Sequence, residues 1–203
     1  RLSAPAYADD FCSVFGADVF ANPDLALLAA EYSLSEYQNT AREFHPFDSK
    51  FDLFLQRKIM LSPQELRGFA LFNRRDKGNC ASCHPSSMKR GALPQFTDYG
   101  YLALAVPRNR ALAQNADAAW HDLGLCGPVR KDLAAHPEYC GLFRTPSLRN
   151  VALRKTFFHN GIMHSLEDAV AFYATRDTDP VRWYGRRADG KPDLYNDLPL
   201  RYR

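Results

Sequence analysis

The sequence lacks the features that would place the protein in a membrane or on nucleic acid. No apolar run approaches the roughly 20 residues that a helix needs to cross a bilayer, so we expect no membrane span. The 26 Lys and Arg residues are interleaved with 23 Asp and Glu residues, and the net charge is only +3. They form no block of the kind that binds nucleic acid, so nucleic acid is not an expected partner.

A secretory leader is also missing from residues 1–40. This stretch has neither a basic n-region nor a continuous apolar h-region. A helical pattern begins within about 25 residues, with no strand or turn signal before it. We therefore expect any signal peptide to have been removed, and the chain to be incomplete at its front.

Strand-type alternation is scarce, and apolar residues recur mainly at helical spacing. The start of one helix is sharply marked, because Ser62 and Glu65 form a capping-box pattern around Pro63. Another is expected after Ser165, which can cap its N-terminus. The pattern predicts a mainly α fold with helices at 24–40, at 51–60, from 63 to near 73, and after Ser165.

Long irregular segments separate these helices. From residue 85 to about 146 the chain is punctuated by Pro and Gly, and only 111–120 looks briefly helical. Long loops of this kind are uncommon in compact domains unless they surround a ligand or serve a function. We expect one domain over 1–203: a helical N-terminal segment (1–60), a ligand-binding core (61–175) and a polar surface tail (176–203).

The sequence Cys80-Ala-Ser-Cys83-His84 carries the most specific chemistry in the chain. A structural zinc site usually needs a second pair of ligands, and no second C-x-x-C and no H-x-x-x-H occurs here. A thioredoxin-like redox motif would need a βαβ context, which the pattern does not predict. We therefore expect a covalent c-type haem, with thioethers from Cys80 and Cys83 and with His84 as the proximal iron ligand. The fold would then be a cytochrome c-like helical haem domain with long wrapping loops.

The other cysteines bear on the compartment. Cys126 and Cys140 flank a 13-residue loop, and bacterial haem attachment takes place outside the cytoplasmic membrane, where thiols oxidise. We expect a disulfide between these two residues, the alternative being two buried free thiols. Cys12 is left over, either buried or paired with a part of the protein outside this chain.

Several blocks of the sequence resemble one protein family. These blocks are LSPQELRGFALFNRRDKGNCASCHPSS, FTDYGY, VPRN, DLGLCGPVRKDL and YCGLFRTPSLRNVALRKTFFHNGIMHSLEDAVAFY. Together they cover roughly residues 24–175 and are similar to the C-terminal haem domain of the bacterial di-haem cytochrome c peroxidase and MauG family. Members carry two haem domains in one chain, each with its own C-x-x-C-H. The resemblance implies that the N-terminal haem domain is absent from this chain, and that the protein is periplasmic.

The resemblance also implies where the second axial ligand lies, fourteen residues beyond His159 of the FHNG turn. That position is Tyr173, where peroxidases of the family usually have Met and MauG-like members have Tyr. A phenolate favours ferric and higher oxidation states, whereas a thioether favours ferrous iron. Met163 is the rival ligand, and a purely packed Tyr173 on the apolar stripe of its helix is the structural alternative.

Further residues are implied by the resemblance alone. His159 would lie near the haem edge or serve as a structural histidine, and Arg149 with its neighbour Asn150 would pack on the haem, the arginine pairing with a propionate. In relatives, carbonyls before the FHNG turn help to hold a calcium ion between the haems. Backbone oxygens of Arg154 and Thr156 could ligate it here, although the cationic pair Arg154 and Lys155 replaces small residues and puts calcium in doubt.

The resemblance implies the low-spin haem domain of a periplasmic di-haem, MauG-like oxidoreductase that uses hydrogen peroxide. This haem would store or relay oxidising equivalents, and no catalytic acid or base is expected in this chain. The implied partners are the N-terminal haem domain or a second chain carrying the peroxide-reactive haem, and a small electron-donor protein or a protein substrate. The alternatives are a monohaem c-type cytochrome that only carries electrons, or a haem-binding subunit without chemistry of its own.

Overall fold

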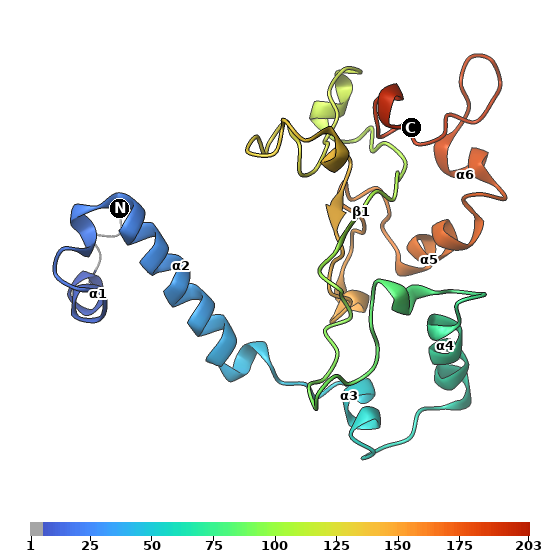
Figure 1. Cartoon of the computed structure of the whole chain (residues 1–203). Coiled ribbons are helices and arrows are strands. Elements are labelled where there is room, and N and C mark those ends of the chain that lie inside the picture. The colour runs from blue at the N-terminus through green and yellow to red at the C-terminus, as the bar shows by residue number, and fades with distance from the viewer. Residues whose placement is uncertain (1–5) are drawn as a thin grey trace. The chain divides into compact units, whose positions relative to one another are not determined.

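The computed structural model describes residues 6–203, so the first five residues of the expected N-terminal segment lie outside the described residues. The chain divides into two compact units, residues 1–53 and 54–203 (Figure 1). Most residues are helical or irregular, which confirms the mainly α expectation. No described helix combines the length and the apolar character that crossing a bilayer requires.

The first unit is built on one long helix. Its helical elements are α1 (Ala8–Phe15), the 3-10 helices η1 (Val19–Ala21) and η2 (Arg42–Phe44), and α2 (Pro23–Thr40). The predicted helix at 24–40 is thus confirmed as α2. It begins here because the Asn22 side chain accepts hydrogen bonds from the backbone N–H groups of Asp24 and Leu25, while Pro23 presets the first turn.

The helix expected at 51–60 is shorter in the structure. It is α3 (Lys50–Leu55), which lies at the division between the two units. Arg57 adopts a positive φ of 61°, which a right-handed helix cannot accommodate, so the chain leaves the helix there. The apolar periodicity that continues to Ile59 belongs to irregular chain.

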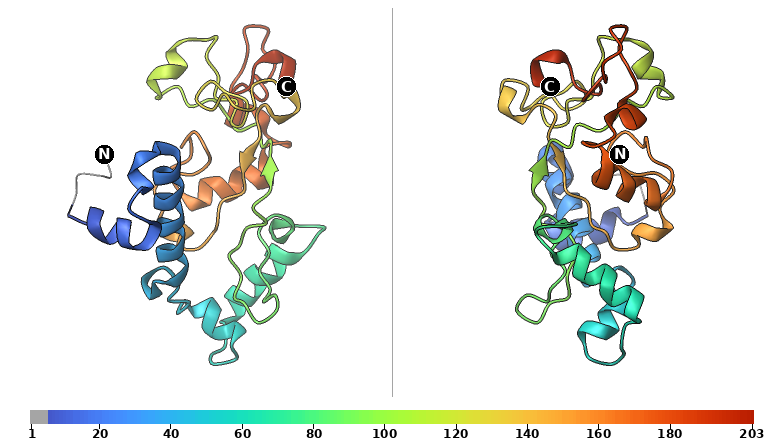
Figure 2. Two further views of the ribbon diagram at one scale, coloured as in Figure 1. Left: turned by 60° about the vertical axis from the view of Figure 1, so that its left-hand side comes forward. Right: turned by 90° about the vertical axis from the view of Figure 1, so that its right-hand side faces the viewer.

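The second unit holds the remaining elements in the order α4 (Pro63–Asn73), η3 (Cys80–Ser82), β1 (Tyr101–Leu102), η4 (Ala113–Ala116), η5 (Pro137–Tyr139), β2 (Phe143–Arg144), η6 (Val151–Leu153), α5 (Leu166–Thr175), α6 (Pro180–Tyr184) and η7 (Leu200–Tyr202). The two helices with cap signals, α4 and α5, begin where the sequence predicts. The brief helix expected at 111–120 is reduced to the four-residue η4. Strands β1 and β2 pair antiparallel, with Tyr101 opposite Arg144 and Leu102 opposite Phe143 (Figure 2).

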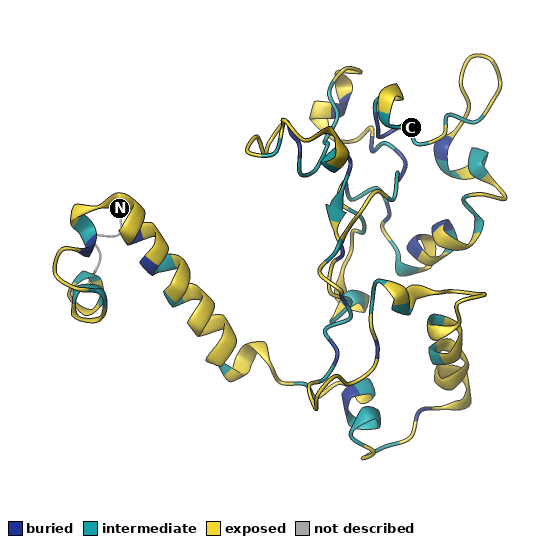
Figure 3. Cartoon of the chain, viewed as in Figure 1, coloured by how far each residue is buried: buried dark blue, intermediate teal, exposed yellow. Residues whose placement is uncertain are grey.

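The core of the second unit includes Phe172 of α5. Val106, Met163, Phe172 and Tyr184 form one buried cluster, in which Val106 and Phe172 are fully excluded from solvent. The helix α5 buries only Ala169 and Phe172, and the rest of its surface is open or partly open (Figure 3).

The segment 176–203 differs from the expected surface tail. Tyr184 enters the core cluster, and Asn196, Asp197 and Leu198 are also buried. Polar residues are buried here because they find partners: the Asn196 Oδ1 accepts the Arg108 backbone N–H at 2.8 Å, and its Nδ2 donates to the Tyr184 carbonyl at 3.1 Å. Composition alone could not show that these partners exist.

Candidate haem site

The helix α4 delivers the chain to the C-x-x-C-H turn. Its N-terminus is closed by a full capping box, in which the Ser62 Oγ accepts the Glu65 N–H at 3.3 Å and the Glu65 carboxylate accepts the Ser62 N–H at 2.7 Å. After Asn73 the chain folds back, and the Asn79 N–H donates to the Arg74 carbonyl. A Cβ at Gly78 would lie 2.6 Å from the Leu71 carbonyl oxygen, so only glycine allows this close approach.

The turn itself gathers the two thiols and the imidazole. The backbone N–H groups of Cys83 and His84 both donate to the Cys80 carbonyl, at 3.3 and 2.9 Å, which makes the tight 3-10 turn η3. Cys80 is exposed and Cys83 is half-buried, and both carry free thiols. Although Cys80 is exposed as a residue, its Sγ lies against the Gly78 backbone, and this partial loss of hydration raises the pKa of the Cys80 thiol.

The His84 ring is held in one tautomer. Its Nδ1 lies 2.7 Å from the Phe96 carbonyl oxygen, and because a carbonyl can only accept, Nδ1–H is the donor. The proton on Nδ1 leaves the lone pair of Nε2 available, which is the state an imidazole must have to bind a metal. Iron ligands in proteins are commonly oriented by such a second hydrogen bond.

Tyr173 lies on α5 and is 55% exposed. It contacts Phe158 and Phe172, with ring centroids 5.8 and 6.0 Å apart. Loss of hydration is the main cause that raises the pKa of Tyr173 to about 12; Arg176 acts in the opposite direction, and the Cys80 and Cys83 thiols add smaller contributions that raise it. Tyr173 is thus more than half exposed while packing against two aromatic rings, and its phenol is within electrostatic range of the two thiols.

Met163, the rival ligand, has a different environment. Its side chain is 7% exposed and belongs to the core cluster with Val106, Phe172 and Tyr184. Its carbonyl accepts the Phe157 N–H at 2.9 Å, which closes the FHNG turn. The two candidates therefore differ in burial, with Met163 in the core and Tyr173 more than half exposed.

His159 joins a buried polar network. Its Nε2 lies 2.9 Å from the Asp197 carboxylate, and its ring stacks on Phe143 with centroids 3.5 Å apart. The same Asp197 oxygen accepts a hydrogen bond from the Asn160 Nδ2, which also donates to the Pro107 carbonyl. These contacts give His159 a structural role, in tying the FHNG turn to the C-terminal segment. Asp197 was not singled out in the sequence, because nothing in its local pattern shows a partner 38 residues away.

The two residues expected to pack on the haem lie after β2. The Arg149 guanidinium donates from Nε and Nη2 to the Pro94 carbonyl, at 2.9 and 2.7 Å, and lies 5.9 Å from the Phe96 ring centroid. Asn150 is exposed in the left-handed conformation, at φ 57°, and leads into η6. The structure thus places the Arg149 guanidinium against the segment of Pro94 and Phe96, whose Phe96 carbonyl accepts the hydrogen bond from His84.

The calcium expectation stays a prediction. Arg154 and Thr156 are exposed, and the described part of the chain has no cluster of three or more His, Cys, Asp or Glu side chains suited to a metal ion. A calcium ion held by backbone oxygens would not need such a cluster, so its absence does not test the expectation.

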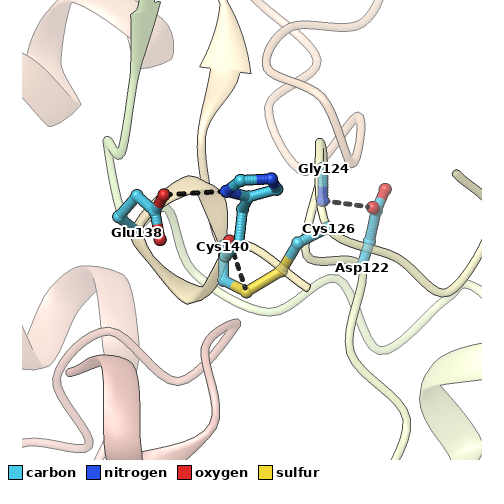
Figure 4. Close-up of a disulfide and its surroundings, with 6 residues drawn as sticks. Asp122, Gly124, Cys126, Glu138 and Cys140 are labelled. Carbon is cyan, nitrogen blue, oxygen red and sulfur yellow. Dashed lines mark hydrogen bonds and ion pairs between the residues drawn. A yellow bond between two sulfur atoms is a disulfide. The ribbon is translucent and has the colours of Figure 1, made fainter. Parts of the chain in front are cut away.

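The disulfide between Cys126 and Cys140 is present, with the two Cα atoms 5.0 Å apart, and this confirms the predicted pair (Figure 4). The residues beside it are held locally: the Asp122 carboxylate accepts the Gly124 N–H at 3.0 Å, and Glu138 pairs with His136. Cys12 is half-buried and forms no disulfide within residues 6–203.

No protein-family model matches the chain. Among curated proteins it is similar to methylamine utilization protein MauG of Paracoccus denitrificans, at 35% identity over 175 residues, covering 83% of this chain and 43% of the relative. It is also similar to cytochrome c551 peroxidase of Pseudomonas aeruginosa, at 32% identity over 174 residues, covering 83% of this chain and 42% of the relative.

Among solved structures, the diheme peroxidase BthA of Burkholderia thailandensis superposes with a TM-score of 0.83 at 41% identity, covering 99% of this chain and 48% of that one. A tyrosine-to-methionine variant of the same peroxidase superposes with a TM-score of 0.84. The chain spans about half the length of the relatives it matches. By sequence and by fold, this chain belongs to the di-haem cytochrome c peroxidase and MauG family, and its length corresponds to one haem domain of such proteins.

Proposed function

We propose that this chain is the low-spin haem domain of a periplasmic, MauG-like di-haem oxidoreductase that uses hydrogen peroxide. The observation that carries the proposal is the state of His84: its Nδ1–H donates to the Phe96 carbonyl, which leaves the Nε2 lone pair available to bind a metal. Two free thiols stand in the same turn. The residues present therefore fit a covalently bound c-type haem.

The second part of the proposal concerns the far side of the iron. Tyr173 is exposed on α5 and within electrostatic range of both thiols, whereas Met163 is buried in the core. A haem with imidazole and phenolate ligands supplies one-electron chemistry biased toward the oxidised states of iron. Tyr173 must lose its proton to bind as phenolate, so its raised pKa means that iron binding releases a proton from a group that otherwise keeps it.

The rest of the enzyme is supplied from outside this chain. The relatives are a MauG protein and peroxidases about twice its length. We propose that a second haem domain carries the peroxide-reactive iron, and that this domain holds one oxidising equivalent until an electron-donor protein or a protein substrate is oxidised. The Cys126–Cys140 disulfide supports a location in an oxidising compartment such as the periplasm.

The test compares three forms of the full chain produced with haem-attachment enzymes: the wild type, Tyr173→Phe and Met163→Leu. We expect a covalent haem in the mass spectrum of each, and a spin-resonance spectrum that changes in Tyr173→Phe only. A colourless protein of bare mass would overturn the whole proposal. A spectrum of His/Met type that Tyr173→Phe leaves unchanged would instead favour the electron-carrying cytochrome with Met163 on the iron.

The peroxide reaction is tested in the complete gene product. We expect two haems per chain and loss of the ferric spectrum on addition of hydrogen peroxide. A single haem per chain with no response to peroxide would contradict the proposed peroxide reaction and favour a cytochrome that only carries electrons.

A further inference from the structure

The loop that orients His84 has a strained conformation. Phe96, whose carbonyl accepts the Nδ1–H of His84, adopts a positive φ of 53°. A bulky residue with a side chain rarely occupies this region, and it stays there only when surrounding contacts hold it. Something other than Phe96 itself must therefore fix the direction of its carbonyl group.

The surrounding contacts come from the chain after β2. Segment 94–97 precedes β1 and segment 145–149 follows β2, so the antiparallel pairing of the two strands sets these segments side by side (Figure 2). The pairing continues beyond the strands, because the Thr145 N–H donates to the Gly100 carbonyl at 2.8 Å.

Four further hydrogen bonds connect the two segments. The Arg149 guanidinium donates twice to the Pro94 carbonyl, the Ser147 Oγ donates to the Gln95 carbonyl at 2.7 Å, and the Thr97 Oγ1 donates to the Thr145 carbonyl at 2.7 Å. Pro94, Thr97 and Thr145 are buried, so the Thr97–Thr145 bond is shielded from water and the Arg149–Pro94 bonds are partly shielded, whereas the Ser147–Gln95 bond is exposed. Phe96 is the member of 94–97 whose carbonyl bonds to His84.

We infer that Arg149 and Ser147 are positioning residues for the proximal ligand: they fix segment 94–97 so that the strained Phe96 carbonyl meets His84 Nδ1–H. This inference rests on the proposed function, since it assigns a role toward a haem iron. It gives Arg149 a different task from contact with a propionate. The bond it supports makes the His84 imidazole a stronger donor to iron and stabilises the ferric state.

The experiment uses the haem-loaded full chain and three variants. Arg149→Lys keeps the charge but loses the two-pronged bond to Pro94, and Ser147→Ala removes one bond at an exposed position where folding is little affected. Arg144→Lys is the matched control, because Arg144 also lies beside this segment but stacks on the Tyr99 ring, 5.0 Å from its centroid.

Two readouts report the His84 bond itself: the exchange rate of the Nδ1 proton by NMR, and the reduction potential of the haem. We expect Arg149→Lys and Ser147→Ala to speed proton exchange roughly three- to tenfold, the range that a weakened hydrogen bond implies, and to make the potential more positive. Arg144→Lys should change neither. A purely structural role of Arg149 would lower stability without changing exchange or potential.

The outcomes separate the two proposals. Haem-loaded variants of Arg149 and Ser147 with wild-type exchange rates and potentials overturn the inference alone. A wild-type chain that takes up no covalent haem overturns the proposed function, and this inference with it. If Arg149→Lys does not fold, Ser147→Ala decides the result by the same two measurements.

Discussion

At the scale of single residues, the site depends on which polar atoms are left available once the chain has folded. His84 gives one ring nitrogen to a backbone carbonyl and keeps the other. Tyr173 is more than half exposed as a residue, while the Met163 side chain is buried in the core cluster. The availability of each side chain, together with its type, is therefore what our proposal for the ligands rests on.

The burial of Met163 leads to a prediction about stability. Met163→Ala should lower the free energy of unfolding by about 2–5 kcal/mol, because it leaves a cavity in the core cluster. Met163→Leu should cost less than about 1.5 kcal/mol, since it nearly conserves volume. Denaturant titration measures both values, and the haem spectrum should be the same in each variant. A changed ligand spectrum in Met163→Leu would mean that Met163 binds the iron.

Tyr184 gives a prediction about alkaline pH. Burial raises the pKa of Tyr184 to about 12, and its hydroxyl donates to the Ala105 carbonyl at 2.7 Å. The unfolded phenol ionises near its ordinary pKa of about 10, so between about pH 10 and 12 the folded state binds more protons. The contribution of Tyr184 to stability should therefore be complete below pH 10 and be lost as the pH rises toward 12.

Tyr184→Phe tests this contribution. It should cost about 1–3 kcal/mol at neutral pH, because the Ala105 carbonyl loses its donor, and it should flatten the decline of stability above pH 10. Urea unfolding at several pH values measures both effects. Tyr37→Phe, at an exposed tyrosine, serves as the control. An alkaline decline as steep in Tyr184→Phe as in the wild type would disagree with the prediction.

At the scale of elements, end signals in the sequence were more reliable than apolar periodicity. Ser62 and Glu65 marked α4, Ser165 marked α5, and both helices begin there. The apolar periodicity across 51–60 predicted too long a helix, because α3 ends at Leu55, shortly before Arg57 adopts a left-handed backbone conformation. Cap side chains act on adjacent backbone and can be recognised locally, whereas the end of α3 follows from a backbone conformation that its residue types do not favour.

The capping box of α4 can be tested by one substitution. Ser62→Ala should lower the free energy of unfolding by about 0.5–2 kcal/mol, because the Glu65 N–H loses its acceptor. Thermal unfolding of the haem-loaded chain gives the value. Ser87→Ala, at an exposed serine outside the helices, should stay within about 0.5 kcal/mol of the wild type. Equal stability of the two variants would show that the box is not needed.

At the scale of the whole molecule, long-range contacts account for what the sequence did not show. The haem motif, the cysteine pair and the fold class could be predicted, because each has a local or compositional signal. The burial of Asp197 against His159, and the contact of Arg149 with Pro94, join residues 38 and 55 positions apart. No pattern in one sequence reports such pairs. The expectation of a polar surface tail therefore did not include the burial of Asp197, and the expected role of Arg149 did not include its contact with Pro94.

The disulfide should contribute to the stability of the second unit as a whole. Its cysteines are 14 positions apart, and closing a loop of this length in the unfolded chain is worth about 3 kcal/mol. The Cys126→Ala/Cys140→Ala double variant should lose about that much free energy of unfolding, measured in denaturant. Cys12→Ala, which opens no loop, should change it little. A double variant as stable as the wild type would mean that the bond serves another purpose.

The acceptor of the His84 ring proton is a main-chain oxygen, and this has a consequence for how such a domain can evolve. A mutation at codon 96 cannot delete a peptide carbonyl, so the hydrogen bond can survive many replacements of Phe96. The exceptions are proline, whose ring fixes φ at about −65°, and side chains branched at Cβ, which resist a φ of 53°. Selection at this position therefore acts on backbone conformation, so the hydrogen bond to His84 can be conserved while the side chain at position 96 changes.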